Sequence, residues 1–464
     1  MQLYKVSWKQ IYENPEKAFL IIGLIFGILF LLVVPPFQVP DEPNHFFRAY
    51  QLSEGEIIGE KQDNNAGGLV PKSLVDSMLL WSNLPFHPEQ KTTSKQFIEA
   101  LNIPLEPQKN TFVGFPNTVL YSPVAYLPQV LGIALGKLFY LSPIVLMYLG
   151  RLTNLIVAIY ITFLAIKITP AFKWVFFLLA LTPMATFQRA SLSADSLINS
   201  ISVLLLALLF KYAFDLNKAK IGRSDIGVLF ILSLLLSLSK QAYFLVPFLC
   251  FLIPPAKFGS QKKYWVVCSL LCLTSAIAWI LWSFVVKDVY VPLRPDVAIA
   301  NEQARFVLSN PTKFAVIAFN DFNASLTGYL KQFIGVLGWL DTLLPNVLTF
   351  SYPAVLLFTS LIDSHANVIV PLQAKLKGFA VWFATIFLIY LLSYFTWTPV
   401  GQASIEGIQG RYFIPIAPLL FLLFYNRKFF LNIHDSKLDV VLVCYSLFAL
   451  VISLIVLLDR YYNL

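Results

Sequence analysis

The sequence predicts an all-α protein that crosses a membrane many times, and three observations support this fold class. Hydrophobic residues make up 58% of the 464-residue chain, and the mean hydropathy is +0.70. Only 13% of the residues are charged, whereas soluble domains carry about 25%. The apolar residues are grouped in runs near the length of about 20 residues that a crossing helix needs, so we expect about eleven transmembrane helices, within roughly ten to twelve.

Several apolar segments are candidates for these helices. They are 18–36, 121–139, 150–168, 174–190, 196–214, 226–240, 242–256, 264–286, 346–362, 378–396, 411–425 and 439–458. The first segment is followed by two prolines, where a cleaved signal peptide would have small residues. We therefore expect it to be retained as a transmembrane helix.

The basic residues between the apolar segments predict which side each connection faces, because short connections rich in Lys and Arg stay in the cytoplasm. The crossings agree with this rule only if 121–139 does not cross. That segment contains two prolines, two glycines and a lysine, which suits a helix lying at the outer interface. The N-terminus is then cytoplasmic and the C-terminus lies outside. Because the basic residues flank membrane segments, the net charge of +9 needs no nucleic-acid partner.

The same arrangement divides the chain into regions. We expect a cytoplasmic N-terminus (1–17), a first transmembrane helix (18–36), an outer segment with interfacial helices and an acidic motif (37–149), a transmembrane core (150–286), a second outer segment (287–345), C-terminal transmembrane helices (346–458) and an outer tail (459–464).

An acidic motif, "VPDEPNHFFRAY", follows the first helix directly. Asp41, His45 and Arg48 fall at i, i+4 and i+7, which is one face of a helix beginning near Pro43. One interpretation is structural, with Asp41 as an N-cap and Glu42 favouring the positive helix end. The other is functional, because a rigid acidic turn at the lipid boundary suits a base that meets a lipid-borne substrate.

Isolated cations are expected at the outer ends of several other segments. They are Arg48, Arg151, Arg189, Lys240 and Arg411. Charged residues inside membrane segments usually have a partner or a function, and arginine offers planar forks of donors to phosphate oxygens. Together these cations predict a site for one phosphate headgroup. The alternative is a scatter of cations that anchor helices at the interface.

Motifs for several other chemistries are absent from the sequence. There is no G-x-x-x-x-G-K-[ST], no H-E-x-x-H and no G-x-S-x-G. ATP-driven transport and zinc-dependent hydrolysis are therefore unsupported.

Two stretches resemble a known family. "PPFQVPDEPNHFFRAYQLSEGEI" and "GIQGRYFIPIAPLL" resemble the bacterial multi-pass membrane family of domain of unknown function 2142. The architecture further resembles the GT-C class of glycosyltransferases, which take sugar from a polyprenyl-phosphate carrier on the outer face. In that resemblance, the acidic residue after the first span corresponds to Asp41 with Glu42. The interfacial helix corresponds to "YSPVAYLPQ", and Arg151, Asp195 and Lys240 match single residues of the class. The large soluble C-terminal domain of some members is missing here.

The resemblance implies an inverting membrane glycosyltransferase of GT-C-like fold. Asp41 would be the catalytic base, assisted by Glu42. The donor phosphate would be bound by Arg151, Lys240 and Arg411, with Arg48 and Arg189. The acceptor would be oriented by His45, Asp195, Glu406 and Tyr412. No metal or cofactor is expected, although Asp41, Glu42 and Asp195 together could hold a divalent cation.

The expected partners are a polyprenyl-phosphate sugar, a cell-envelope glycan or glycolipid acceptor and the lipid bilayer. A separate donor synthase and flippase are implied by the class. The location would be the bacterial plasma membrane, with the active site on the outer face.

Two alternatives remain open at the level of the sequence. A polymerase or ligase that moves a whole lipid-linked glycan would need a larger outer cavity and a cluster of arginines. A transporter or flippase without chemistry would have ionisable residues near the membrane midplane and an inverted repeat.

Overall fold

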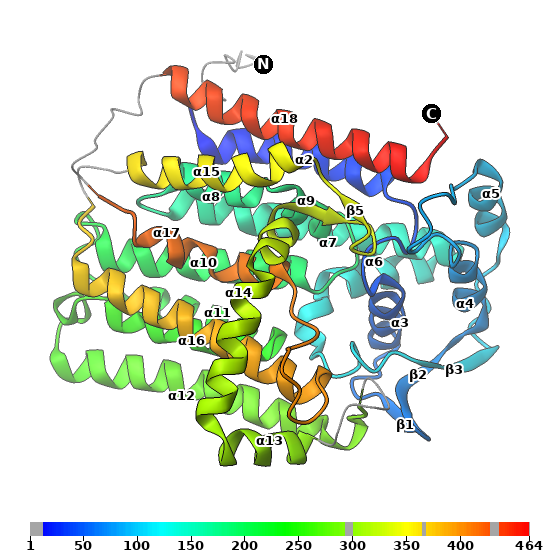
Figure 1. Cartoon of the computed structure of the whole chain (residues 1–464), viewed down its shortest axis with the longest axis horizontal. Helices are drawn as coiled ribbons and strands as arrows, with labels where there is room; N and C mark the ends of the chain where they lie inside the picture. The colour runs from blue at the N-terminus through cyan, green and yellow to red at the C-terminus, as the bar shows by residue number, and fades with distance from the viewer. Residues whose placement is uncertain (1–12, 293–299, 364–367, 427–435, 464) are drawn as a thin grey trace.

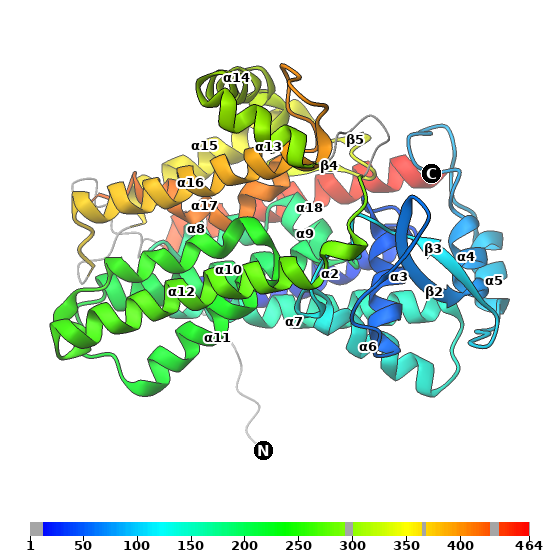
Figure 2. The ribbon, with the colours of Figure 1, turned by 90° about the horizontal axis from the view of Figure 1, so that it is seen from below.

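The computed structural model describes residues 13–292, 300–363, 368–426 and 436–463, and it is mostly helical (Figure 1). Long helices lie side by side, and the segment between the first two of them folds at one end of this bundle (Figure 2). The sidedness prediction also used Lys5 and Lys9 near the N-terminus and Arg427 and Lys428 before the last apolar segment, and these four lie outside the described residues.

Six helices in the described ranges are long and apolar enough to cross a membrane. They are α2 (Pro15–Val33), α7 (Pro143–Ile168), α10 (Asp195–Phe214), α12 (Gln261–Val285), α16 (Leu372–Trp397) and α18 (Ser436–Tyr461). With 19 to 26 residues, they are about 28–39 Å long, enough for a hydrocarbon core of about 30 Å. α10 is the most buried of them, and it packs against α7 and α11 (Arg223–Ser239). These helices fit a multi-pass membrane location.

Other expected spans are short or broken. Segment 174–190 forms two helices, α8 (Lys173–Ala180) and α9 (Pro183–Arg189), because Pro183 begins a new helix that the Thr182 hydroxyl caps. Segment 242–256 forms 3-10 helices, η2 (Gln241–Leu252) and η3 (Pro255–Phe258). Segment 411–425 is covered by η5 (Gly410–Ile416) and α17 (Ala417–Leu422). α15 (Asn346–Ile362) has 17 residues. The expectation of continuous helices over 174–190 and 411–425 was therefore wrong.

Segment 121–139 forms a 3-10 turn followed by a short α-helix. η1 (Pro123–Tyr126) leads into α6 (Leu127–Leu138), whose 12 residues extend about 18 Å. α6 packs along α7 and α3 (Glu42–Ser53). Its other side exposes four leucines, Leu127, Leu131, Leu135 and Leu138.

The region 37–149 is not purely helical, which corrects the expected all-α class. Strands β1 (Glu60–Gln62), β2 (Asn65–Pro71) and β3 (Asn110–Gly114) form an antiparallel sheet in that order. Helices α4 (Lys72–Leu79) and α5 (Ser94–Asn102) lie between β2 and β3 in the chain. A Cβ atom on Gly67 would lie 1.8 Å from the Val113 carbonyl oxygen, so the close β2–β3 approach requires glycine there.

The region 287–345 contains a long helix that the sequence did not predict. η4 (Lys287–Val289) and α13 (Ala300–Ser309) precede α14 (Pro311–Gly335), and a two-stranded hairpin, β4 (Val336–Leu337) and β5 (Thr342–Leu343), follows. α14 runs across the long helices rather than along them (Figure 1). Asn320, Asp321 and Asn323 interrupt its apolar pattern. For this reason the sequence predicted a segment outside the membrane here.

The C-terminal end of α18 is attached to the region 37–149. Arg460 donates to Asp341 Oδ2 (2.9 Å) and to the Leu84 carbonyl (2.7 Å). The Thr92 backbone N–H donates to the Tyr461 carbonyl (2.9 Å). These bonds hold α18, the β4–β5 hairpin and the region 37–149 together at one end of the bundle.

Candidate functional site

Four charged residues that are far apart in the sequence meet at one end of the helical bundle. Asp41 precedes α3, Asp195 begins α10, Lys240 follows α11, and Arg411 lies in the first turn of η5. α10 packs against both α11 and η5, so the ends of three elements converge. We call Asp41, Asp195, Lys240 and Arg411 the charged cluster.

Asp41 has a backbone conformation that side chains rarely adopt, with φ at +63°. It occupies the N-cap position of α3, yet within the described residues its carboxylate makes no capping hydrogen bond. Instead Asn117 Nδ2 donates to Asp41 Oδ1 (2.9 Å), and Arg411 lies 3.7 Å from Oδ2. The side chain is 36% exposed. The geometry thus directs the carboxylate away from the helix end and toward the rest of the cluster.

Asp195 is shared by the two cations of the cluster. Lys240 Nζ donates to its Oδ1 (2.8 Å), while Arg411 Nε lies 3.8 Å from its Oδ2. Gln188 Nε2 also donates to Oδ2 (3.2 Å). Arg411 is 4% exposed, and its Nε is a buried donor without a hydrogen-bond partner among the described residues. A buried donor of this kind is costly unless something else accepts from it.

His45 lies beneath the cluster in a buried position. Its Nδ1 is 2.7 Å from the Tyr126 hydroxyl. Burial lowers the pKa of His45 to about 4, although Asp41 and Asp195 act in the opposite direction. Burial also raises the pKa of Tyr121, whose ring lies near His45, to about 12. His45 is therefore a neutral side chain at neutral pH and contributes no charge to the site.

A cavity of about 220 Å³ opens beside the cluster, between the 116–121 segment, α11, η2, α12 and α16. Its polar lining residues include Asn117, Tyr121, Lys240, Gln241, Ser393 and Tyr412. Its apolar lining residues include Leu238, Trp282, Ile389, Leu392 and Trp397. Lys240 Nζ lies 3.9 Å from the centre of the Tyr412 ring. The cavity lining therefore combines the charged Lys240 with polar and apolar side chains.

Glu42 and Arg151 form a separate, fully buried pair. Arg151 Nε donates to Glu42 Oε1 (2.8 Å), and its Nη2 donates to Oε2 (2.5 Å). The remaining Arg151 donors reach the carbonyls of Leu31, Val34 and Pro35. Neither side chain is exposed, so this geometry favours a structural role over the catalytic and phosphate-binding roles that we expected for them.

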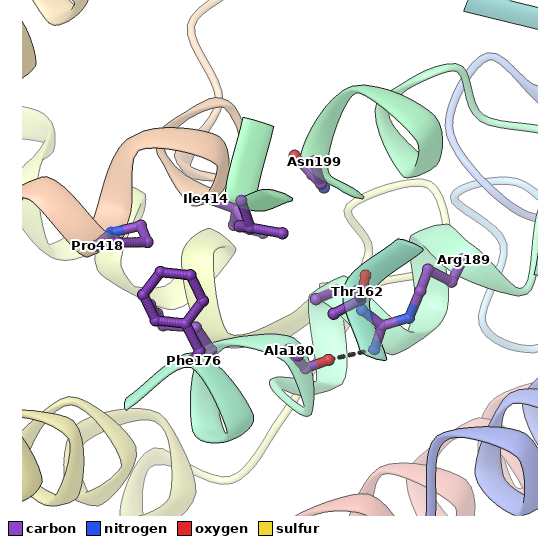
Figure 3. A pocket seen from close by; sticks show the side chains of 10 residues that line it. Thr162, Phe176, Ala180, Arg189, Asn199, Ile414 and Pro418 are labelled. Carbon is purple, nitrogen blue, oxygen red and sulfur yellow. Dashed lines mark hydrogen bonds between the residues drawn. The ribbon is translucent and has the colours of Figure 1, made fainter. Parts of the chain in front are cut away.

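Arg48 and Arg189 also point away from the charged cluster. Arg48 donates to Gln51 and to the carbonyls of Ile57 and Tyr121. Arg189 donates to the Ala180 carbonyl at the end of α8, beside a small cavity of about 20 Å³ (Figure 3), which has room for about one water molecule. In this conformation neither guanidinium faces the larger cavity, in contrast to the expected phosphate-binding role.

The last two expected residues lie on the chain leading into η5. The backbone carbonyl of Tyr412 accepts from the Tyr243 hydroxyl (2.8 Å), and its ring lines the cavity. The Glu406 carboxylate accepts from Gln402 Nε2 (3.1 Å), next to the cavity residue Gly407. Tyr412 therefore belongs to the cavity, while Glu406 lies beside it.

Asn117 and Gln188 were missed at the level of the sequence, although both bind carboxylates of the cluster. A single amide in "GFPNTVL" or "ATFQRAS" gives no periodic or charge signal, so only the folded chain reveals its partner. Among the residues that the structure describes, no group of three or more His, Cys, Asp or Glu side chains could hold a metal ion.

Comparison with protein families gives a match over most of the chain. The model of a family described as a predicted membrane protein, DUF2142, matches residues 24–420. This range includes all four members of the charged cluster and ends before α18. No curated protein and no solved structure matches the chain.

Proposed function

The chain belongs to the DUF2142 family of predicted membrane proteins, and from this starting point we propose that it is an inverting glycosyltransferase. It would transfer a monosaccharide from a polyprenyl-phosphate carrier to a cell-envelope acceptor on the outer face of the bacterial plasma membrane. The N-terminus would be cytoplasmic. A separate synthase and flippase would make and deliver the donor.

The observation that carries the proposal is the cavity beside the charged cluster, whose lining combines Lys240 with polar and apolar side chains. A lipid-linked sugar phosphate likewise combines a charged headgroup with a hydrocarbon chain. The volume of about 220 Å³ lies below the range of about 300–1,000 Å³ that is usual for pockets holding drug-sized ligands. This supports one sugar unit with its phosphate rather than a whole glycan.

Lys240 and Arg411 are the cations that suit the phosphate. Both contact Asp195, and Arg411 Nε is buried without a hydrogen-bond partner in the described part of the chain. A phosphate oxygen would satisfy this donor. Asp195 would hold the two cations in place between turnovers. Preorganised donors of this kind stabilise negative charge as it develops on a leaving group.

Asp41 would act as the general base on the acceptor hydroxyl. The proton moves to the Asp41 carboxylate as the acceptor oxygen bonds to the anomeric carbon from the face opposite the phosphate. The bond between that carbon and the phosphate oxygen breaks, and its electron pair stays on the phosphate beside Lys240 and Arg411. The sugar configuration is inverted because a single displacement occurs.

The test is sugar transfer in proteoliposomes. Purified protein is supplied with radiolabelled polyprenyl-phosphate sugars and cell-envelope extract, and Asp41→Asn is compared with wild type. The matched control is Asp76→Asn, which changes an exposed aspartate on α4 of the same region. We expect transfer by wild type and by Asp76→Asn, and a loss of at least about 100-fold in Asp41→Asn, the usual lower range for a general base.

The outcomes separate the alternatives. Equal transfer by Asp41→Asn and by wild type would show that Asp41 is not the base. The proposed glycosyltransferase activity would still stand. Movement of the labelled lipid across the bilayer without transfer would overturn the glycosyltransferase in favour of a flippase.

A further inference from the structure

A chain of two amides ends on Asp41. Asn117 Nδ2 lies 2.9 Å from Asp41 Oδ1, and Asn44 Nδ2 lies 2.7 Å from Asn117 Oδ1. An ionised carboxylate only accepts hydrogen bonds, so the Asn117 NH₂ group must face Asp41. The Asn117 carbonyl then faces Asn44, whose NH₂ group must be its donor. The charge on Asp41 therefore fixes the orientation of both amides.

The backbone around Asn117 is held from two sides. The Thr118 hydroxyl donates to the Asn44 carbonyl (3.0 Å), so bonds cross between α3 and the 117–118 segment in both directions. The Phe115 N–H donates to the Ala66 carbonyl (2.8 Å), which continues the β2–β3 pairing to within two residues of Asn117. Asn117 is thus presented by the sheet rather than by a free loop.

This arrangement makes the two oxygens of Asp41 inequivalent. Oδ1 is occupied by Asn117. Oδ2 faces Arg411 at 3.7 Å, and in the described part of the chain no hydrogen bond reaches it. Since the side chain is 36% exposed, Oδ2 is the oxygen that an incoming hydroxyl can approach.

We infer that Asn117 is the positioning residue for Asp41. Its amide holds Oδ1, so that Oδ2 receives the proton of the acceptor hydroxyl as the acceptor oxygen bonds to the anomeric carbon and the phosphate leaves with the electron pair of the broken bond. Asn117 exchanges no proton, and Asn44, which donates to the Asn117 side-chain oxygen, is the second member of the same chain. This inference rests on the proposed function.

A simpler role is available to Asn117, because it also lines the cavity. A residue that only contacts the donor changes donor binding, and hence KM. A residue that orients the base changes kcat and leaves the donor KM unaltered. The two roles therefore differ in a measurable quantity.

The decisive variant is Asn117→Ala, which removes the NH₂ donor and adds no charge to the cavity. We expect kcat at neutral pH to fall about 10- to 100-fold, since hydrogen bonds to charged groups are worth such factors, while the donor KM stays within about twofold.

The matched control is Asn310→Ala, because in the described part of the chain the Asn310 amide donates to the Phe306 carbonyl (3.1 Å), just before α14 and away from the charged cluster. Its kcat and KM should equal those of wild type. Wild-type kcat in Asn117→Ala would overturn the inference, and so would equal changes in kcat and donor KM.

A second measurement does not depend on transfer. The infrared carboxylate stretch of Asp41, assigned by its disappearance in Asp41→Asn, should shift in frequency in Asn117→Ala and stay unchanged in Asn310→Ala. An unshifted band in Asn117→Ala would overturn the positioning role even if the enzyme is active. A shifted band in a protein that transfers no sugar would support the hydrogen bond and overturn the proposed function alone.

Discussion

Asp41 and Glu42 are adjacent in the sequence, yet their carboxylates have opposite surroundings. The Asp41 side chain is 36% exposed and reaches a cavity-lining amide, whereas Glu42 is fully buried against Arg151 and also accepts from the Leu192 N–H (3.1 Å). The positive φ of Asp41 sends the two side chains in different directions. The two adjacent carboxylates therefore lie in different places, one in the candidate site and one in the core.

Because Glu42 and Arg151 form a buried pair, substitution of either residue is expected to lower the stability strongly. Glu42→Gln leaves the Arg151 charge uncompensated in the core, so the free energy of unfolding should fall by about 3–5 kcal/mol. Arg151→Lys should also destabilise, because an ammonium cannot reproduce the fork of bonds to the carboxylate and carbonyls. Unfolding in detergent measures both.

The control for this prediction is Glu54→Gln. Glu54 pairs with Lys137 at a partly exposed position, where the loss should be at most about 1 kcal/mol. An unfolding free energy for Glu42→Gln within that smaller range would show that Glu42 does not hold the core.

His45 predicts a dependence of stability on pH. Its pKa is about 4 in the folded chain and 6.5 as a free side chain, so the unfolded state binds more protons between these values. Stability contributed by neutral His45 is present above about pH 6.5 and is lost as the pH falls toward 4. Between pH 7.5 and 5.0 the loss from this group is about 2 kcal/mol.

The variant that isolates this effect is His45→Gln, which keeps a polar partner for the Tyr126 hydroxyl but does not titrate. The difference in unfolding free energy between wild type and His45→Gln should change by that amount over the same pH interval. A constant difference would mean that His45 protonates as readily in the folded chain as in the unfolded one.

At the scale of elements, α13 and α14 bind the segment between α16 and η5, which leads directly to Arg411. Gln303 Nε2 donates to the Tyr394 carbonyl (3.0 Å), and its Oε1 accepts from the Gly401 N–H (3.2 Å). Asp321 accepts from the Ile405 N–H (3.0 Å), and Gln332 accepts from the Gly410 N–H (2.7 Å). The helix that crosses the bundle thus fixes the connection between α16 and η5.

Gly410 provides a test of this contact. A Cβ atom there would lie 2.0 Å from the Tyr329 carbonyl oxygen of α14, so Gly410→Ala must displace η5 and with it Arg411. Misplacement by about 1 Å can cost about 100-fold in rate, and we expect sugar transfer to fall about 10- to 100-fold.

The control is Gly328→Ala, in α14 itself, where nothing lies within 4 Å of the added atom. It should keep wild-type transfer and gain a few tenths to about 1 kcal/mol of stability from its higher helix propensity. Full transfer by Gly410→Ala would show that the α14 contact does not position Arg411.

At the scale of the whole molecule, the charged cluster, the sheet and the end of α18 all lie at one end of the bundle. The proposed sidedness puts this end outside the cell. Impermeant maleimide should label Lys109→Cys, at an exposed position before β3, in intact cells. It should label Lys262→Cys, at an exposed position in the first turn of α12, only after permeabilisation.

The background for this experiment is Cys444→Ala, because Cys444 is the exposed cysteine among the four, and the other three are buried. Both substituted positions must label after permeabilisation to show that they are accessible. The reverse labelling pattern would invert the membrane orientation and would place the candidate site on the cytoplasmic side.

The sequence by itself determined the class of protein and the long helices, since apolar length is a local property of the chain. It also singled out Asp41, Asp195, Lys240 and Arg411, because a charge next to an apolar run is visible without the fold. Short strands such as β1 and β3 and the polar crossing helix α14 carry weak local patterns, so they were missed.

Only the tertiary structure decided which partner each arginine and lysine of the candidate set contacts. In the sequence, all five cations look alike, because each lies next to an apolar segment. In the structure, Arg151, Arg48 and Arg189 donate to Glu42, Gln51 or main-chain carbonyls, whereas Lys240 and Arg411 lie in the charged cluster. The selection depends on which helix ends pack together, across separations of more than 100 residues for Arg151 and Glu42. A buried charge must be paired wherever the fold leaves it, and local sequence does not specify which partner will be adjacent.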